Sequence, residues 1–69
     1  MTIGERIREA RKKRGLLQSK LAELLGVAEN TVSSWEIGAR VPSVKNIREI
    51  AIILSCSTDY LLDVTDRLE

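Results

Sequence analysis

The chain has 69 residues, a formal net charge of +1, one cysteine and no histidine. Its length allows one domain, near the smallest size at which a single hydrophobic core is sufficient. A lone cysteine excludes an internal disulfide, and the lack of histidine argues against a metal site, so we expect no metal and no cofactor. The sequence has no run of about 18 apolar residues, and its charged N-terminus lacks the apolar centre of a signal peptide. We therefore expect a cytoplasmic protein.

Charge is unevenly distributed along the chain. Residues 1–20 carry seven Lys or Arg and two Glu, a net charge of +5, whereas residues 21–40 and 41–69 each carry a net charge of −2. A basic segment of this kind is suited to phosphate groups, although a run of charge is also the ordinary composition of a solvated helix face.

The first helix is predicted to begin at Ile3, because Thr2 and Glu5 have the spacing of a capping box. An apolar residue recurs every third or fourth position from Ile3 to Ala10, which gives this helix one inward stripe. Gly15 is suited to the position just after its end.

A second helix is predicted over residues 18–25, with its apolar stripe between Leu21 and Leu25. Gly26 follows, at the left-handed position that ends many helices and that disfavours a Cβ. A third helix begins at residue 28 or 29. Two short helices joined by a glycine turn, each with one inward stripe, must cross steeply to share a core, and Ala22 is small enough for this crossing. The pattern is that of a helix-turn-helix.

A fourth helix is predicted after Pro42, with Ser43 as its N-cap. Its inward stripe consists of Val44, Ile47, Ile50, Ala51 and Leu54. Ile52 and Ile53 widen this stripe beyond what one core face needs. A short fifth helix is predicted over residues 58–63, capped by the hydroxyl of Ser57 or Thr58.

The combined pattern resembles the phage-repressor, Cro-like (XRE-type) family of helix-turn-helix domains. The motif has alanine at its fifth place (Ala22), glycine at its ninth (Gly26), and apolar residues at Leu21, Leu25, Val27, Val32 and Trp35. The flanking segments 3–15 and 38–62 resemble the family's first, fourth and fifth helices. The resemblance implies an all-α fold, a compact bundle of five helices with a helix-turn-helix.

This domain is expected over residues 1–66, followed by a frayed tail at residues 67–69. Leu68 and Glu69 fit the remnant of a cloning vector as well as native sequence. Cys56 falls where the family has a small apolar residue, so we expect a buried and inert thiol.

The resemblance implies that the third helix lies in the major groove of DNA. With Val32 and Trp35 facing the core, the polar side chains of this helix face the other way. We expect base contacts from four of them, namely Asn30, Ser34, Glu29 and Ser33. Asparagine can bond adenine through two hydrogen bonds, and a carboxylate can accept one from cytosine N4. Serine and asparagine at a helix end are also common as plain surface.

Phosphate contacts are implied for Gln18, at the start of the second helix, and for Arg40, in the loop after the third. The N–H groups and dipole at the start of the second helix favour an anion there. The alternative for Gln18 is an exposed helix former. The basic cluster adds Lys12, Lys13 and Arg14 as further phosphate candidates.

Other residues of the motif are assigned structural roles. In the family, the arginine matching Arg11 pairs with the glutamate matching Glu36, and this pair would lock the first helix to the third. Trp35 is expected in the core rather than stacked on bases. Leu17 stands where the family carries a Ser or Thr cap, so about 1 kcal/mol of capping is expected to be missing at the second helix. Ala28 likewise replaces the usual Ser or Thr cap of the third helix.

These features predict a sequence-specific DNA-binding transcriptional regulator, a repressor of prophage or bacterial type or else an activator, which acts by occupying its site. A second hypothesis is a helix-turn-helix used for protein contact, as in an antitoxin or adapter. The polar third helix and the basic first segment favour DNA. With no histidine, no glycine-rich loop and no paired carboxylates in an apolar setting, we expect no enzyme.

The predicted partner is double-stranded DNA with a two-fold operator, bound by a homodimer, without a membrane or a small-molecule ligand. The family pairs through its C-terminal end, so the dimer candidates are Leu61, Leu62 and Val64, with Ile52 or Ile53. The same residues could instead complete the core. The chain could also be the DNA-binding half of a longer repressor.

Overall fold

The chain folds as a bundle of short helices in the computed structural model, which describes residues 1–64. The helices of this range are α1 (Ile3–Lys13), α2 (Gln18–Leu25), α3 (Glu29–Glu36), α4 (Val44–Ile53) and α5 (Thr58–Leu61). The all-α prediction with five helices is thereby confirmed. The predicted tail at residues 67–69 lies outside the described residues.

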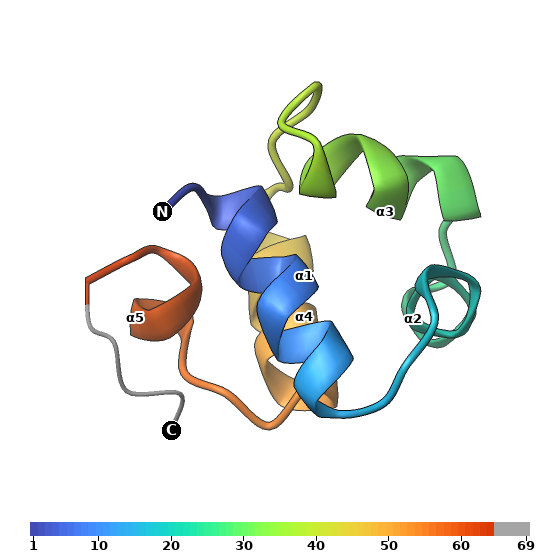
Figure 1. Cartoon of the computed structure of the whole chain (residues 1–69). Coiled ribbons are helices and arrows are strands. Elements are labelled where there is room, and N and C mark those ends of the chain that lie inside the picture. The colour runs from blue at the N-terminus through green and yellow to red at the C-terminus, as the bar shows by residue number, and fades with distance from the viewer. Residues whose placement is uncertain (65–69) are drawn as a thin grey trace.

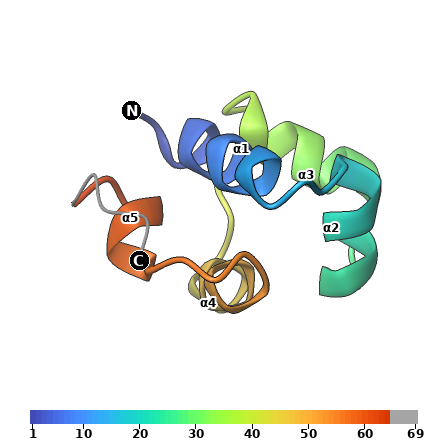
Figure 2. The ribbon, with the colours of Figure 1, turned by 60° about the horizontal axis from the view of Figure 1, so that its bottom comes forward.

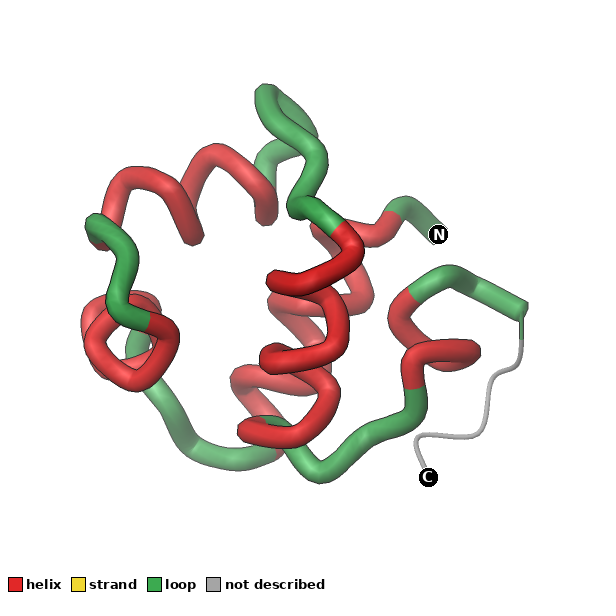
Figure 3. The backbone as a smooth tube through the Cα atoms, turned by 180° about the vertical axis from the view of Figure 1, so that it is seen from behind, coloured by secondary structure: helices red, strands yellow, loops and turns green. Residues whose placement is uncertain are grey.

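The helix-turn-helix lies at one side of the molecule and α5 at the other, with α1 and α4 between them (Figures 1 and 2). In Figure 1, α2 is seen nearly end-on while α3 runs across the view, so the two helices cross steeply, as their glycine turn requires. From behind, the loop between α3 and α4 projects beyond the bundle (Figure 3). No helix of the described residues is both long and apolar enough to span a membrane.

Side-chain caps begin three of the helices. At α1 the Thr2 hydroxyl accepts the Glu5 backbone N–H at 3.1 Å, and the Glu5 carboxylate accepts the Thr2 N–H at 2.8 Å, which completes the predicted capping box. The hydroxyls of Ser43 and Ser57 accept the corresponding N–H groups at α4 and α5. These starts are therefore set by local sequence, each cap contributing on the order of 1 kcal/mol.

All five helices contribute to one apolar core. Its buried members are Ile7, Ala10, Leu21, Ala22, Val32, Trp35, Ile47, Ile50, Ala51, Leu54, Tyr60 and Leu61. Trp35 is only 4% exposed and lies where the apolar stripe of α3 places it. Ala22, 3% exposed, allows the close crossing of α2 and α3.

Two predictions about α4 and α5 are wrong. Val44, expected in the inward stripe, is 75% exposed, because it is the first residue of α4 and lies beyond the core. The fifth helix ends at Leu61 rather than Asp63, whose φ of +64° is left-handed and incompatible with continuing the helix.

Polar contacts join α5 to α1. The hydroxyl of Tyr60, a fully buried residue, donates to the Glu9 carboxylate at 2.7 Å, and the Arg6 guanidinium lies 4.6 Å from the centre of the Tyr60 ring. Arg6 also donates to the Asp63 carboxylate. Burial raises the pKa of the Tyr60 hydroxyl, with the Glu9 hydrogen bond adding to the shift, so the hydroxyl remains a donor at neutral pH. The tyrosine thus provides both core volume and a polar tie.

Gly4 allows α1 to approach α3 closely. A Cβ at this position would overlap the backbone oxygen of Trp35 and lie 2.9 Å from that of Glu36. Within a helix, replacing glycine by alanine ordinarily stabilises by roughly 0.5–1 kcal/mol. Here the two helices would have to separate.

We therefore expect Gly4→Ala to lower the free energy of unfolding by about 1–3 kcal/mol, the usual cost of overpacking. Urea unfolding followed by circular dichroism measures it. Arg8→Ala, at an exposed position of α1, is the control and should change stability by no more than about 0.5 kcal/mol. Stabilisation by Gly4→Ala would show that the α1–α3 approach is looser than described.

Candidate nucleic-acid interface

The turn between α2 and α3 follows from Gly26, whose φ of +73° is left-handed. The N–H of Val27 returns to the carbonyl of Ala22 at 3.0 Å, which closes the end of α2. The chain then turns directly into α3, so the two helices are held in one rigid unit.

Neither helix of this unit has a side-chain cap. Leu17 and Ala28 occupy the N-cap positions of α2 and α3, and neither side chain accepts a hydrogen bond from the first turn. The first-turn N–H groups of both helices therefore lack a side-chain acceptor, and the positive ends of both helix dipoles are left to the surroundings.

A polar hollow of about 390 Å³ lies between the start of α2 and the first half of α3. Gln18, Glu29, Asn30 and Ser33 line it. The structure thus brings together three of the four predicted base-contact residues and the first predicted phosphate contact. A hollow with amide, hydroxyl and carboxylate groups can both donate and accept hydrogen bonds.

The remaining predicted base and loop contacts lie just beyond this hollow. Ser34 is half-buried, one turn after Asn30. Its carbonyl accepts the N–H groups of Ala39 at 2.9 Å and Arg40 at 3.2 Å, which ties the exposed loop to the end of α3. Arg40 is itself exposed and lies against a second hollow, formed mainly by the start of α1 and the loop after α3.

Beneath the hollow is a buried ion pair between α1 and α3. The Arg11 guanidinium donates to the Glu36 carboxylate through Nε at 2.7 Å and Nη2 at 3.1 Å. Both side chains are nearly inaccessible, with exposures of 8% and 2%. The pairing implied by the family resemblance is thus present. Arg11 also donates to the carbonyl of Leu16 at 2.7 Å, in the loop that leads to α2.

The Glu36 carboxylate also accepts a hydrogen bond from Gln18, a residue predicted to contact phosphate. The Gln18 amide donates through Nε2 to the Glu36 Oε1 at 3.0 Å. Periodicity could not have found this contact, because it joins the first residue of α2 to the last residue of α3. The only available signal was the resemblance, which assigned Glu36 to Arg11 alone.

The basic cluster divides into two kinds of side chain. Lys12 and Lys13 are exposed, with the Lys13 ammonium 3.8 Å from the Glu9 carboxylate. The Arg14 guanidinium instead donates to the carbonyls of Leu54 at 2.6 Å and Ser55 at 2.8 Å. Arg14 therefore caps the C-terminal end of α4, a structural role that the sequence analysis missed.

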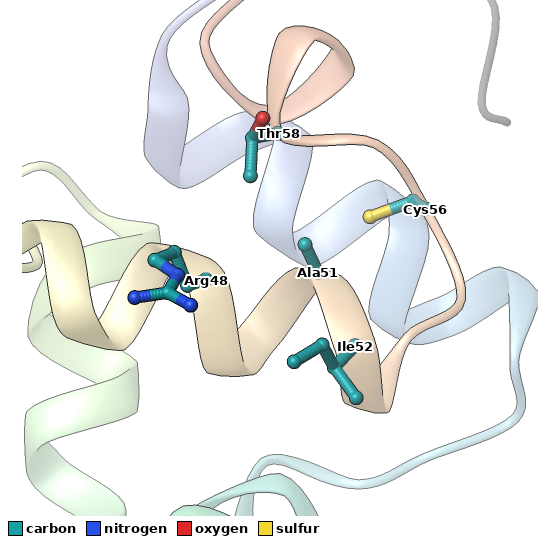
Figure 4. Close-up of a pocket in the computed structure, with 5 residues that line it drawn as sticks. All are labelled: Arg48, Ala51, Ile52, Cys56 and Thr58. Atoms are coloured by element: carbon teal, nitrogen blue, oxygen red, sulfur yellow. The ribbon is translucent and has the colours of Figure 1, made fainter.

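A hollow of about 240 Å³ lies between α4 and the start of α5 (Figure 4). Its lining consists of Arg48, Ala51, Ile52, Cys56 and Thr58. Cys56 is half-buried rather than fully buried as expected, and burial raises the pKa of its thiol, which keeps it protonated at neutral pH.

Only some of the predicted dimer residues have exposed side chains. Leu61 is fully buried in the core, so its side chain is not available for pairing, a correction to the prediction. Leu62, Val64 and Ile52 are exposed, whereas Ile53 packs against the core. Among the described residues, no group of three or more His, Cys, Asp or Glu side chains is placed to hold a metal ion.

Comparison with known proteins gives a consistent class. The family described as Helix-turn-helix (HTH_3) matches residues 7–61. The transcriptional regulator ImmR of Bacillus subtilis is 37% identical over 62 residues, which are 90% of this chain and 49% of that protein. Repressor protein C2 of Salmonella phage P22 is 40% identical over 60 residues, 87% of this chain and 28% of that protein. The chain thus spans half or less of the length of these two relatives.

Solved structures agree with this class. The P22 c2 repressor in complex with a synthetic operator has a TM-score of 0.87 and 37% identity, covering 94% of this chain and 98% of that one. SinR in complex with DNA has a TM-score of 0.81 and 36% identity, covering 87% and 97%. The chain belongs to the helix-turn-helix family, in the phage-repressor, Cro-like group that its motif resembles.

The position of Arg14 leads to a test that separates capping from phosphate binding. If the guanidinium caps α4, Arg14→Ala should cost about 1 kcal/mol and lower the melting temperature by roughly 4–8 °C. The salt dependence of DNA binding should then stay unchanged. A phosphate contact would give the opposite result, with an unchanged melting temperature and a salt slope reduced by about one. Thermal unfolding and anisotropy titrations at several salt concentrations measure both quantities.

Proposed function

We propose that this chain is a sequence-specific DNA-binding domain of a transcriptional regulator, with α3 in the major groove. The observation that carries the proposal is the polar hollow, in which Gln18 at the uncapped start of α2 lies beside Glu29, Asn30 and Ser33 on α3. Phosphate-binding and base-contacting groups must lie side by side in this way when a helix enters a groove. The similarity to the P22 c2 repressor, solved with a synthetic operator, supports the same arrangement.

Two sets of contacts have separate tasks in this proposal. Gln18, Arg40, Lys12 and Lys13 hold the sugar–phosphate backbone and set the register, together with the free N–H groups at the start of α2. The polar side chains of α3 contact base edges and select the sequence, with Ser34 one turn after Asn30. The exposed face of α3 carries this role, while Val32 and Trp35 hold the opposite face in the core.

Assembly on DNA follows from the small size of the site. One domain covers only a few base pairs, so tight and specific binding requires two copies on a two-fold operator, with half-sites about one helical turn apart. Leu62, Val64 and Ile52 supply exposed apolar surface for pairing. Occupancy of the operator then represses or activates transcription. Binding without catalysis, in the cytoplasm where bacterial DNA lies, is sufficient for this task.

The direct test is an anisotropy titration of the chain with labelled mixed genomic fragments at low and moderate salt. Binding that weakens steeply with salt supports the proposal, because released counterions drive association with DNA. Selection of bound sites from random duplexes should then enrich a two-fold sequence. Absence of binding at both salt concentrations would overturn the proposal and favour a protein-contact module, for which the exposed Ile37 and Val41 offer apolar surface.

The backbone contacts lead to a paired prediction. Gln18→Ala and Arg40→Ala should each weaken binding to selected and scrambled duplexes by the same factor, because phosphate contacts carry no sequence information. Arg40→Ala should also lower the salt slope by about one, whereas Gln18→Ala should not, since its amide is neutral. Titrations on both duplexes at three salt concentrations measure this. A change in sequence preference with either variant would assign that residue to the bases instead.

Glu29 leads to a prediction of opposite sign. Its carboxylate is exposed in the first turn of α3 and approaches phosphate charge, so it opposes binding except where it accepts a hydrogen bond, as from cytosine N4. Glu29→Gln should therefore raise affinity for scrambled DNA and relax preference at one base pair by on the order of 1–3 kcal/mol.

The measurement is a pair of titrations, with selected and scrambled duplex, at one salt concentration. An equal rise on both duplexes would make Glu29 a repulsive surface charge without a role in selection. No change on either duplex would mean that this side chain points away from the groove.

A further inference from the structure

Glu36 has more partners than an ion pair requires. Its buried carboxylate accepts two N–H groups from Arg11 on α1 and one from the Gln18 amide on α2. Glu36 itself is the last residue of α3. One carboxylate therefore joins the three helices whose relative placement determines whether α3 and the start of α2 can meet DNA together.

The geometry leaves Gln18 with a defined group to offer. A glutamine amide carries two N–H donors, and one of them is directed to the Glu36 Oε1 at 3.0 Å. The second N–H is then left for another acceptor, and Gln18 lines the hollow together with Asn30 and Ser33. Without the Glu36 contact this long side chain at an uncapped helix start would sample several rotamers.

Arg11 makes a buried carboxylate at this place compatible with DNA. Two N–H groups of the guanidinium neutralise Glu36, so the network adds no net negative charge beneath the hollow. A third Arg11 N–H holds the Leu16 carbonyl at 2.7 Å and so fixes the loop from which α2 begins. The backbone position and the side-chain direction of Gln18 are thus set by one network.

We propose that Glu36, held by Arg11, is a positioning residue that aims the Gln18 amide at a DNA phosphate. This inference rests on the proposed DNA-binding function and adds a task to a pair otherwise needed only for folding. Because Glu36 is the last residue of α3, the same hydrogen bond ties Gln18, the proposed phosphate contact on α2, to the position of α3.

The test compares two backgrounds that differ only in the acceptor for Gln18. Arg11→Met with Glu36→Leu removes the ion pair and the acceptor, whereas Arg11→Met with Glu36→Gln removes the charges and keeps an acceptor oxygen. Replacing a buried ion pair by apolar residues of similar volume is often neutral for stability, so the first background should fold. Gln18→Ala is then introduced into the wild type and into each background, and affinity for scrambled duplex is measured.

Gln18→Ala should weaken binding by about tenfold in the wild type, the scale of one hydrogen bond to a charged group. The loss of affinity caused by Gln18→Ala should remain several-fold in the Glu36→Gln background, which keeps the acceptor. It should fall to about twofold or less in the Glu36→Leu background, which lacks the acceptor. Leu61→Val, a destabilising control in α5 on the far side of the molecule, should leave the tenfold factor unchanged (Figure 1). If Gln18→Ala weakens binding by the same factor in the wild type and in both backgrounds, the inference is overturned.

A measurement on the unmodified chain does not depend on any variant folding. Gln18 is the only glutamine in the sequence, so its side-chain amide can be followed by NMR relaxation, with the exposed Asn30 amide in the same hollow as control. The order parameter should exceed about 0.7 for Gln18 and lie below about 0.6 for Asn30. Equal mobility of the two amides would overturn the inference.

The failure of this inference differs from the failure of the proposed function. If the wild type binds DNA and Gln18→Ala has no effect on affinity, the phosphate contact of Gln18 and its positioning by Glu36 are overturned, while the DNA-binding function stands. If the wild type binds no DNA at either salt concentration, the proposed function and the positioning role both fall.

Discussion

The rest of the structure depends on the buried pair of Arg11 and Glu36. Removing either partner would leave an uncompensated charge in the interior, which costs about 3–5 kcal/mol, a large part of the stability of so small a domain. The same guanidinium holds the Leu16 carbonyl and the same carboxylate holds the Gln18 amide. The pair thus fixes α1 against α3 and also positions the start of α2. Stability and the geometry of the surface that we propose meets DNA therefore depend on one interaction, which makes them hard to vary separately.

The helix-turn-helix unit divides α3 between two tasks. Val32 and Trp35 bury one face, while Glu29 and Asn30 are left exposed on the other. The uncapped start of α3 costs some stability, and it leaves N–H groups and the positive end of the dipole at the surface that we propose meets DNA. A residue that is unfavourable for the isolated helix is thereby compatible with binding an anionic partner.

Charge along the chain overstates the number of cations available to DNA. Three arginines of the basic first segment have partners within the chain: Arg6 with Asp63 and the Tyr60 ring, Arg11 with Glu36, and Arg14 with the end of α4. An arginine engaged with a carboxylate or with helix-end carbonyls supports the fold and contributes less to counterion release. In the proposed complex with DNA, the salt dependence of binding should accordingly depend on the exposed Lys12, Lys13 and Arg40 more than on these three arginines.

The sequence by itself determined the features that depend on near neighbours. Helix starts follow from caps such as Thr2, the turn follows from Gly26, and the inward stripes follow from apolar spacing, because each requires only residues within a turn or two. Only the tertiary structure decided the contacts between distant segments. The bond from Gln18 to Glu36 and the placement of Arg14 on α4 join residues 18 and 40 positions apart. A long polar side chain can reach several acceptors, and packing of the helices selects one, which no local pattern encodes.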